Sequence, residues 1–338
     1  MKILFLNHIE ADYGESYLWN GLVQVLGHEN VYDWPIKSTY HGKNSENVDI
    51  PEQNIYGGAV ACPPWMPGTP EHTETKQSIS QKLREGFFNL VVLGSYRLIT
   101  IKTFLELQDS IRAASVPVVL HDGEDYASLN TEAWRLVRPD YYLKREWLKS
   151  NPFTVKESGT TVFPFPFSAP DCLCVDLPTQ FDYTVAALLG GSWDARKDLC
   201  DALIDVPGAY VAHGSYPNHE TGKHGLKGFD EYIGILRRSR FGVSMRGWGC
   251  DTCRYWEVAV STGLIADELD IHIPNQFTPD VNYLKYDDTE HASSIAWDIA
   301  VWERPNMFDE IRSAGITHAR QFHTNSARVK WLLEQIIN

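Results

Sequence analysis

The sequence predicts an α/β protein made of two doubly wound domains, and three observations lead to this prediction. Short apolar runs alternate with helical patterns along the chain, as in parallel sheets that are covered by helices. The chain has 338 residues, which is more than a single domain usually contains. A proline-rich stretch headed by FPFPFSAP separates two such series and is expected to be a linker.

The first domain is expected to span residues 1–165. Strands are predicted where a short aliphatic run is bounded by glycine or by polar residues. These runs are Lys2–Asn7, Val31–Trp34, Leu90–Gly94, Val116–His121 and Asp140–Lys144. Helices are predicted at Gly14–Leu26 and Ile99–Ala114.

The linker is expected at residues 166–182. It overlaps a proline-rich region that runs from Phe163 to Pro178. The second domain is expected to span residues 183–320. Its predicted strands are Tyr183–Leu189, Ala209–His213, Phe241–Ser244 and Leu264–Ala266. Its predicted helices are Asp194–Ile204, Asp230–Arg238 and Thr252–Ser261.

A final helix is predicted within residues 321–338. It places Val329, Leu332, Leu333 and Ile336 on one apolar stripe. A stripe of this kind has to be buried against another element. We expect the helix to return toward the first domain.

Composition narrows the class of protein. The net charge of −14 argues against a large nucleic-acid footprint, although a local basic groove is not excluded. No apolar run approaches the roughly 20 residues that a membrane-spanning helix needs. The start, MKILFLNHIE, reads as a buried strand and not as a signal peptide. With six cysteines, this favours a cytoplasmic protein with free thiols.

The most informative segment is RFGVSMRGWGCDTCRYWEVAVSTGLIAD, which begins at Arg240. It reads as a strand, a glycine-bearing loop, a helix and a second strand. Gly247 and Gly249 let the backbone approach a ligand, and the helix start that follows offers N–H groups to an anion. Arg254 in the first helical turn can bind phosphate oxygens, and Glu257 one turn later can accept from a ribose diol. The segment therefore suits a nucleoside diphosphate.

The RYWE run behind the RGWGCDT loop resembles the donor-site motif of GT-B glycosyltransferases. The resemblance is greatest to the CgeB-like, family 1-type enzymes and more distant to the phage DNA glucosyltransferases. The YLKRE run at Tyr142 resembles a turn of CgeB-like proteins as well. The resemblance implies a GT-B fold, in which two Rossmann-like domains face each other across a cleft. The plainer alternative is an ordinary βαβ unit with Asp251 as helix cap and Arg254 in a surface salt bridge.

The resemblance also implies a donor, a reaction and a donor site. A hexosyl- or pentosyltransferase would take its sugar from a nucleotide sugar, with a UDP-sugar expected, and would use no cofactor and no metal. The GGS turn after the strand Tyr183–Leu189 resembles the glycine loop that closes over the pyrophosphate, although it could be a plain strand–helix turn. The expected donor site comprises Gly190, Gly191, Ser192, Arg196, Arg246, Gly247, Gly249, Asp251, Thr252, Arg254 and Glu257.

A catalytic base is expected at the strand ends of the first domain. An inverting transfer needs a group that takes the proton of the acceptor hydroxyl, and Asp122 in the turn HDGEDY suits this task. Glu124 and Asp125 are its substitutes, and the alternative is a solvated acidic turn. His8, after the first strand, is a further candidate for a base or a hydrogen-bond donor.

Other functions stay open at this stage. The acceptor could be a saccharide, a small molecule, a protein or, as in the phage enzymes, hydroxymethylated DNA. A non-catalytic nucleotide-sugar-binding or assembly protein would carry the same donor motif. An NAD-dependent dehydrogenase is suggested by Gly247, Gly249 and the later Asp267, but Thr252 stands where the third glycine of that fingerprint belongs.

Three further segments yield weaker expectations. A zinc site formed by the pairs Cys172/Cys174 and Cys250/Cys253 is disfavoured because the two spacings differ, and no metal is expected. The long loop Gly57–Gln77 could be an acceptor-side lid or a mobile segment. The loop His213–Lys227 is expected beside the nucleotide base.

Overall fold

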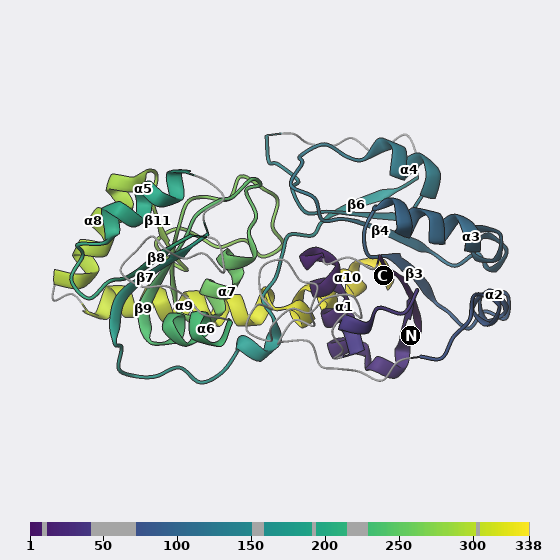
Figure 1. Cartoon of the computed structure of the whole chain (residues 1–338), viewed down its shortest axis with the longest axis horizontal. Helices are drawn as coiled ribbons and strands as arrows, with labels where there is room; N and C mark the ends of the chain where they lie inside the picture. Colours follow the sequence, from purple (N-terminus) through teal and green to yellow (C-terminus); the bar gives the residue numbers. More distant parts are fainter. Residues whose placement is uncertain are drawn as a thin grey trace.

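The computed structural model describes residues 1–8, 12–41, 72–150, 159–190, 194–214, 229–301 and 305–337. Two α/β domains lie side by side along the longest axis of the molecule (Figure 1). Among the described residues, no helix combines the length and the apolar character that are needed to span a bilayer.

The first domain is a parallel sheet of six strands in the order β2-β1-β3-β4-β5-β6. The strands are β1 (Ile3–Leu6), β2 (Val31–Trp34), β3 (Leu90–Leu93), β4 (Val118–Asp122), β5 (Tyr141–Lys144) and β6 (Thr161–Pro164). The helices are α1 (Tyr13–Leu26), α2 (Lys76–Arg84), α3 (Leu98–Ala114) and α4 (Thr131–Val137). Both faces of the sheet are buried, which explains why its strands are almost uniformly apolar.

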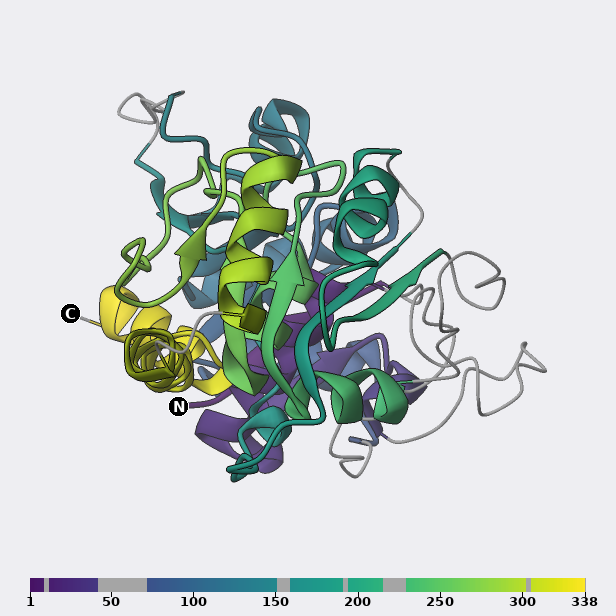
Figure 2. The same cartoon turned by 90° about the vertical axis from the view of Figure 1, so that its left-hand side faces the viewer.

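The second domain is a parallel sheet of five strands in the order β11-β10-β9-β7-β8. The strands are β7 (Tyr183–Leu189), β8 (Tyr210–His213), β9 (Ser239–Ser244), β10 (Gly263–Ala266) and β11 (Leu284–Lys285). The helices are α5 (Asp194–Leu203), α6 (Phe229–Arg237), α7 (Cys253–Ser261) and α8 (Thr289–Val301). Helices α5 and α8 cover one face and α6 and α7 the other, as the end-on view of this domain shows (Figure 2).

Two C-terminal helices connect the domains. Helix α9 (Pro305–Phe322) packs on the second domain, and α10 (Asn325–Ile337) continues along the first domain beside α1 (Figure 1). The predicted apolar stripe of α10 is the part that is buried there, with Val329 and Leu332 inside the core of the first domain. The prediction that the last helix returns to the first domain is confirmed.

The chain crosses between the domains at two places that lie side by side. Ala169, in the first crossing, donates its N–H to His323 O at 2.9 Å and accepts from Asn325 N at 2.8 Å. The side chain of Asn325 accepts from Ser168 Oγ at 2.7 Å and donates to Asn20 Oδ1 at 2.9 Å. These bonds join the linker, the α9–α10 junction and α1 into one connection.

The structure corrects the prediction at the start of the proline-rich region. Phe163 and Pro164, at the start of that region, were not predicted to form a strand, but they belong to β6, which pairs with β5. A proline is tolerated in β6 because this strand lies at the edge of the sheet and needs no donor on its outer side. Strand β11 and helices α2, α4, α8 and α9 were not predicted.

Helices α1 and α10 pack tightly against each other at Gly21. A Cβ at this position would collide with Asn325 O and would lie 2.5 Å from a methyl group of Val329. Both approaches are closer than any normal contact, so only glycine allows this packing.

We therefore expect Gly21→Ala to lower the free energy of unfolding by about 1–3 kcal/mol through overpacking. Gly234→Ala, in α6, is the matched control because a Cβ added there would have nothing within 4 Å. The control should be neutral or slightly stabilising, since alanine favours helices. Urea unfolding of both variants measures the difference, and equal stabilities would contradict the packing described here.

Candidate functional site

Two glycines and two arginines meet at the carboxyl end of the second sheet. A Cβ on Gly190, after β7, would lie 3.6 Å from Arg196 Nη1 and 3.9 Å from Arg254 Nη1. A Cβ on Gly247, after β9, would lie 3.1 Å from Arg196 Nη2. The structure thus brings together four of the predicted donor residues from four separate elements. Ligands of doubly wound sheets bind at this end of the strands.

Arg196 is buried and holds the loop that follows β9. Its Nε donates to Arg246 O at 3.1 Å, and its Nη2 donates to Met245 O at 2.9 Å. Burial, and then the positive charge of Arg254, lower the pKa of Arg196 to about 10. Two guanidinium groups this close repel each other, and an anion bound between them would remove the repulsion. The pair is therefore a candidate site for a diphosphate.

Arg254 and Glu257 lie one turn apart on α7, and both contact Tyr232 of α6. The guanidinium carbon of Arg254 lies 5.6 Å from the centre of the Tyr232 ring. The Tyr232 hydroxyl donates to Glu257 Oε2 at 3.0 Å, and Glu257 is only 1% exposed. Sequence reasoning missed Tyr232 because a tyrosine on a helix 25 positions away from Glu257 gives no motif.

The loop before α7 uses its amides in a way that was not expected. The carboxylate of Glu146, from the first domain, accepts from the N–H groups of Cys250 and Asp251 at 3.0 and 2.9 Å. A Cβ on Gly249 would collide with Glu146 Oε1, so this glycine makes room for a side chain of the other domain. In this structure the loop amides that were expected to face a phosphate bind a carboxylate of the protein itself. Arg246, also predicted here, is exposed.

Asp251 and Thr252 also differ from the expectation. Asp251 is buried and accepts from Phe167 N at 2.5 Å and from Trp256 Nε1 at 2.7 Å. Its carboxylate therefore fastens the linker to α7 instead of facing a ligand. The N-cap of α7 is Thr252, whose side chain makes no capping hydrogen bond. Asp251 thus does not compete for the N–H groups of the first helical turn.

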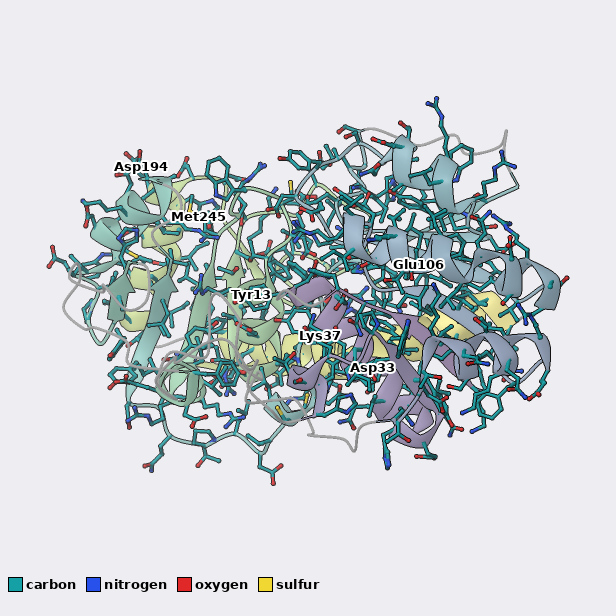
Figure 3. The ribbon with its side chains drawn as sticks, turned by 45° about the vertical axis from the view of Figure 1, so that its right-hand side comes forward. Tyr13, Asp33, Lys37, Glu106, Asp194 and Met245 are labelled. Carbon is teal, nitrogen blue, oxygen red and sulfur yellow. The ribbon has the colours of Figure 1, made fainter. Side chains whose placement is uncertain are left out.

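The starts of α1 and α7 lie against each other across the domain boundary. Cys253 packs against the core of the first domain. Burial, and then the neighbouring Cys253 and Glu257, raise the pKa of Tyr17, which lies on α1. Tyr13 at the start of α1 lies where the two domains meet (Figure 3). The carboxyl ends of both sheets therefore adjoin one site.

On the side of the first domain, the nominated base Asp122 is buried. Its Oδ2 accepts from the Tyr142 hydroxyl at 2.6 Å and from Lys144 Nζ at 2.9 Å. The Asp122 side chain is 1% exposed and that of Lys144 is fully buried. A carboxylate with two such donors stabilises the strand ends of β4 and β5. It has little freedom to take a proton from a substrate.

The two substitutes for Asp122 are more accessible, and each is in an ion pair. Glu124 lies 2.9 Å from Arg97 Nη2, and burial raises its pKa although Arg97 opposes this. Asp125 is paired with Arg145, and its side chain is 49% exposed. Arg145 also lies 3.3 Å from Glu146 Oε1. The acidic turn is therefore linked to the contact that Glu146 makes with the second domain, which we call the Glu146 clasp.

His8 lies at the end of β1 in a buried cluster of charged groups. Its Nδ1 lies 2.9 Å from Glu15 Oε2, which identifies Nδ1 as the protonated nitrogen because an ionised carboxylate only accepts. Glu15 also accepts from Lys37 Nζ at 2.7 Å and from the Tyr40 hydroxyl at 2.6 Å. Lys37 lies inside the first domain beside Asp33 (Figure 3). The other nitrogen of His8, Nε2, is buried and has no hydrogen-bond partner among the described residues.

The cluster fixes the charge of Glu15. Burial by itself would raise the pKa of Glu15, but the charge of Lys37 and the hydrogen bond from His8 lower it to about 2. Sequence reasoning nominated His8 but missed Glu15, Lys37 and Tyr40. Their signal was present in part, because Glu15 is the one acidic residue in the first turn of α1.

A second histidine, His121, lies two strands away at the end of β4. Its Nδ1 lies 2.8 Å from Gly94 O, so this nitrogen carries the proton. Burial lowers the pKa of His121 and keeps the ring neutral. A Cβ on Gly14 would lie 2.8 Å from its Cε1, which places the ring beside the start of α1. His121 was part of the predicted acidic turn but was not nominated for a role.

Some predicted residues lie outside the described part of the chain. They are Gly191, Ser192, most of the loop Gly57–Gln77 and nearly all of His213–Lys227. Five cysteines are described, and all of them are free thiols. Within the described ranges, no group of three or more His, Cys, Asp or Glu side chains is arranged to hold a metal ion.

The whole chain superposes on HepE of Anabaena. In its complex with UDP and glucose, HepE aligns over 100% of both chains with a TM-score of 0.61 and 12% identity. In its complex with UDP-glucose it aligns over 99% of both chains with a TM-score of 0.60 and 11% identity. The protein has the GT-B fold.

The GT-B fold confirms the predicted architecture of two Rossmann-like domains that face each other. At this level of identity the likeness concerns the fold alone. No protein-family model matches the sequence, and no curated protein matches it. The roles of individual residues in this GT-B protein therefore rest on the geometry above.

We expect Glu15→Gln to destabilise the protein by about 3 kcal/mol near neutral pH, because it leaves the charge of Lys37 buried without a partner. The pKa of Glu15 is lowered to about 2 on folding, so its contribution is complete above its ordinary value of 4.5. The contribution is lost as the pH falls from about 4.5 toward 2. The free energy of unfolding of both proteins, measured between pH 7 and pH 3, should therefore converge at low pH.

Glu106→Gln is the control for this prediction. Glu106 forms an ion pair with Lys76, and both side chains are about half exposed. This variant should unfold much like the wild type at every pH. A difference between wild type and Glu15→Gln that does not shrink on acidification would contradict the assigned charge.

Proposed function

We propose that this protein is a glycosyltransferase that transfers a sugar from a nucleoside diphosphate sugar to a hydroxyl of an acceptor. A UDP-sugar is the expected donor. The observation that carries the proposal is the pair of guanidinium groups, Arg196 and Arg254, directed at the same side of Gly190. That HepE, which has the same fold, was solved with UDP-glucose supports testing uridine nucleotides first.

The arginine pair fits the charge that develops in this reaction. Breaking the bond between the sugar and the phosphate leaves a diphosphate with additional negative charge. Arg196 and Arg254 would stabilise this leaving group, together with the helix dipole at the start of α7. The position of Arg196 is fixed before the ligand arrives, because its guanidinium group is bonded to the loop after β9. Fixed cations of this kind can do the work that a metal ion does elsewhere.

Glu257 extends the donor site by one helical turn. Its carboxylate is held by the Tyr232 hydroxyl and lies on the same face of α7 as Arg254. A ribose that is attached to the diphosphate would reach this depth, and its hydroxyl groups donate to a carboxylate. The Gly190 and Gly247 backbones leave the space that the phosphates need.

His8 fits the part of the catalytic base better than Asp122. The Nδ1–H of His8 is bonded to Glu15, so the lone pair on Nε2 is the one available to take a proton. Glu15 would stabilise the imidazolium that forms, and it holds the ring in one orientation. Asp122, by contrast, already accepts from Tyr142 and Lys144. We infer an inverting transfer with His8 as base.

The other functions fit the geometry less well. A dinucleotide fingerprint would need a third glycine where Thr252 caps α7, and it would leave the arginine pair without a role. A DNA substrate remains compatible with the phage-type resemblance but is opposed by the net charge of −14. A non-catalytic binding protein would keep the donor site and would need no base, so His8 distinguishes it from an enzyme.

We expect Arg254→Ala and Arg196→Ala each to weaken UDP binding by at least tenfold, since each removes a cation from the diphosphate. Arg238→Ala is the control, because Arg238 forms an exposed ion pair with Asp182 in the same domain. Isothermal titration with UDP, UDP-glucose and NAD⁺ measures the effect. Binding of NAD⁺ alone would favour the dehydrogenase, and unchanged UDP binding by both variants would refute the phosphate site.

We expect His8→Asn to reduce the rate of transfer by a factor of about 10²–10⁴ without weakening donor binding. Transfer is followed by the release of UDP from UDP-sugars in the presence of acceptor mixtures. Asp122→Asn should instead lower the stability, because it leaves Lys144 buried without its carboxylate. A folded Asp122→Asn protein that loses catalysis, beside an active His8→Asn, would return the role of base to Asp122.

A further inference from the structure

Two strongly exposed aromatic residues flank one contact between the domains. Trp248 is 82% exposed and Tyr126 is 68% exposed. Gly249, the neighbour of Trp248, would place a Cβ only 3.0 Å from Oδ1 of Asp125, the neighbour of Tyr126. Single exposed aromatic residues are common on protein surfaces. One from each domain, beside the same contact, is a specific arrangement.

The loop that carries Trp248 is fixed on both sides of the indole. Before it, Arg196 binds the carbonyl oxygens of Met245 and Arg246. After it, Glu146 binds the N–H groups of Cys250 and Asp251. The N–H of Gly247 also donates to Gly249 O at 3.1 Å, across Trp248 itself. A side chain on such a rigid loop loses little conformational freedom when it binds a ligand.

The acidic turn contributes carboxylates to the same contact, since Asp125 precedes Tyr126 in the chain and approaches Gly249, the neighbour of Trp248. The Asp125 side chain is 49% exposed and that of Glu124 is 26% exposed. An ionised carboxylate only accepts hydrogen bonds, so it selects a ligand that is rich in donors. The face of an indole ring is electron-rich and attracts the C–H groups of a flat apolar surface. A sugar ring offers both, with C–H groups on its faces and hydroxyl groups at its edge.

The position of Trp248 relative to the proposed donor site also favours a sugar as its ligand. Glu257, on the side expected for the ribose, lies one turn beyond Arg254, and the arginine pair follows at Gly190. In the chain, Trp248 stands between Gly247, whose Cβ would lie 3.1 Å from Arg196 Nη2, and Gly249, whose Cβ would lie 3.0 Å from Asp125 Oδ1. A ligand on Trp248 would therefore lie between the arginine pair and the acidic turn of the first domain, where an acceptor has to meet the donor.

We infer that Trp248 and Tyr126 form the binding surface for a saccharide acceptor, with a sugar ring stacked on Trp248 and its hydroxyl groups bound by Asp125 and Glu124. The inference rests on the proposed function, because the donor site supplies the reason for an acceptor to bind here. The acceptor surface belongs to both domains. It is complete only while the Glu146 clasp holds them together.

The test measures the binding of an array of immobilised oligosaccharides to the UDP-saturated protein. Trp248→Ala should weaken the glycan signals of the wild type by about tenfold or more, and Trp248→Phe should retain a part of them. Trp297→Ala is the matched control, since Trp297 is 42% exposed on α8, far from the domain boundary (Figure 1). This control should bind glycans like the wild type.

Titration of the same proteins with UDP separates the two proposals. The inference is upheld if Trp248→Ala binds UDP normally and has lost the glycans. It is overturned, with the donor site intact, if the wild type binds UDP but no glycan or if Trp248→Ala keeps the glycan signals. Loss of UDP binding in Trp248→Ala would overturn it too, because the indole would then belong to the donor site. A wild type that binds glycans but no UDP would refute the donor site and leave the saccharide surface.

Discussion

The candidate site depends on one buried carboxylate that crosses from one domain to the other. Glu146 of the first domain binds the two amides that precede α7, and Arg145 lies 3.3 Å from it. Burial raises the pKa of Glu146, and the charge of Arg145 and the two amides work against this rise. Because these amides belong to the loop between the predicted donor residues, the shape of the proposed donor site is coupled to the relative position of the domains.

The two halves of the site carry charges of opposite sign. The second domain contributes the cations Arg196 and Arg254, and the first contributes Glu15, Glu124 and Asp125. A transfer reaction needs such a division, since the leaving group gains negative charge while the acceptor loses a proton. The carboxylates of the first domain are neutralised in part by cations of the same domain, as Lys37 shows for Glu15. The site thus keeps its polarity without an unpaired charge at Glu15.

Sequence patterns predicted most strands and the meeting of four candidate donor residues, because both depend on local chemistry. The apolar runs of β2 and β7 match the structure residue for residue. The convergence of Gly190, Arg196, Gly247 and Arg254 followed from placing each at the carboxyl end of a parallel strand. Local patterns could not predict which residues from distant parts of the chain contact them. Glu146 reaches Cys250 over 104 positions, and no local pattern records this contact.

The surroundings of the candidate bases could not be predicted for a related reason. Asp122 follows a strand as a base would, but Tyr142 and Lys144 of the neighbouring strand engage it. A motif shows that a carboxylate stands at a strand end and does not show which side chains surround it. For His8 the situation is reversed. A histidine after a strand is a weak signal in the sequence, but in the structure Glu15 on the following helix orients its ring.

The paired crossings near Ala169 and Asn325 determine how the molecule can move. The two segments are hydrogen-bonded to each other, so a rotation of the domains has to bend both of them together, and they act as a single hinge. Asn325 is bonded to Asn20 as well, so the axis of that rotation is anchored in α1. The same helix carries Glu15 near its start. Opening and closing would thus pivot about a point on the helix that orients the proposed base. His8 and Glu15 would stay aligned while the arginine pair moves toward or away from them.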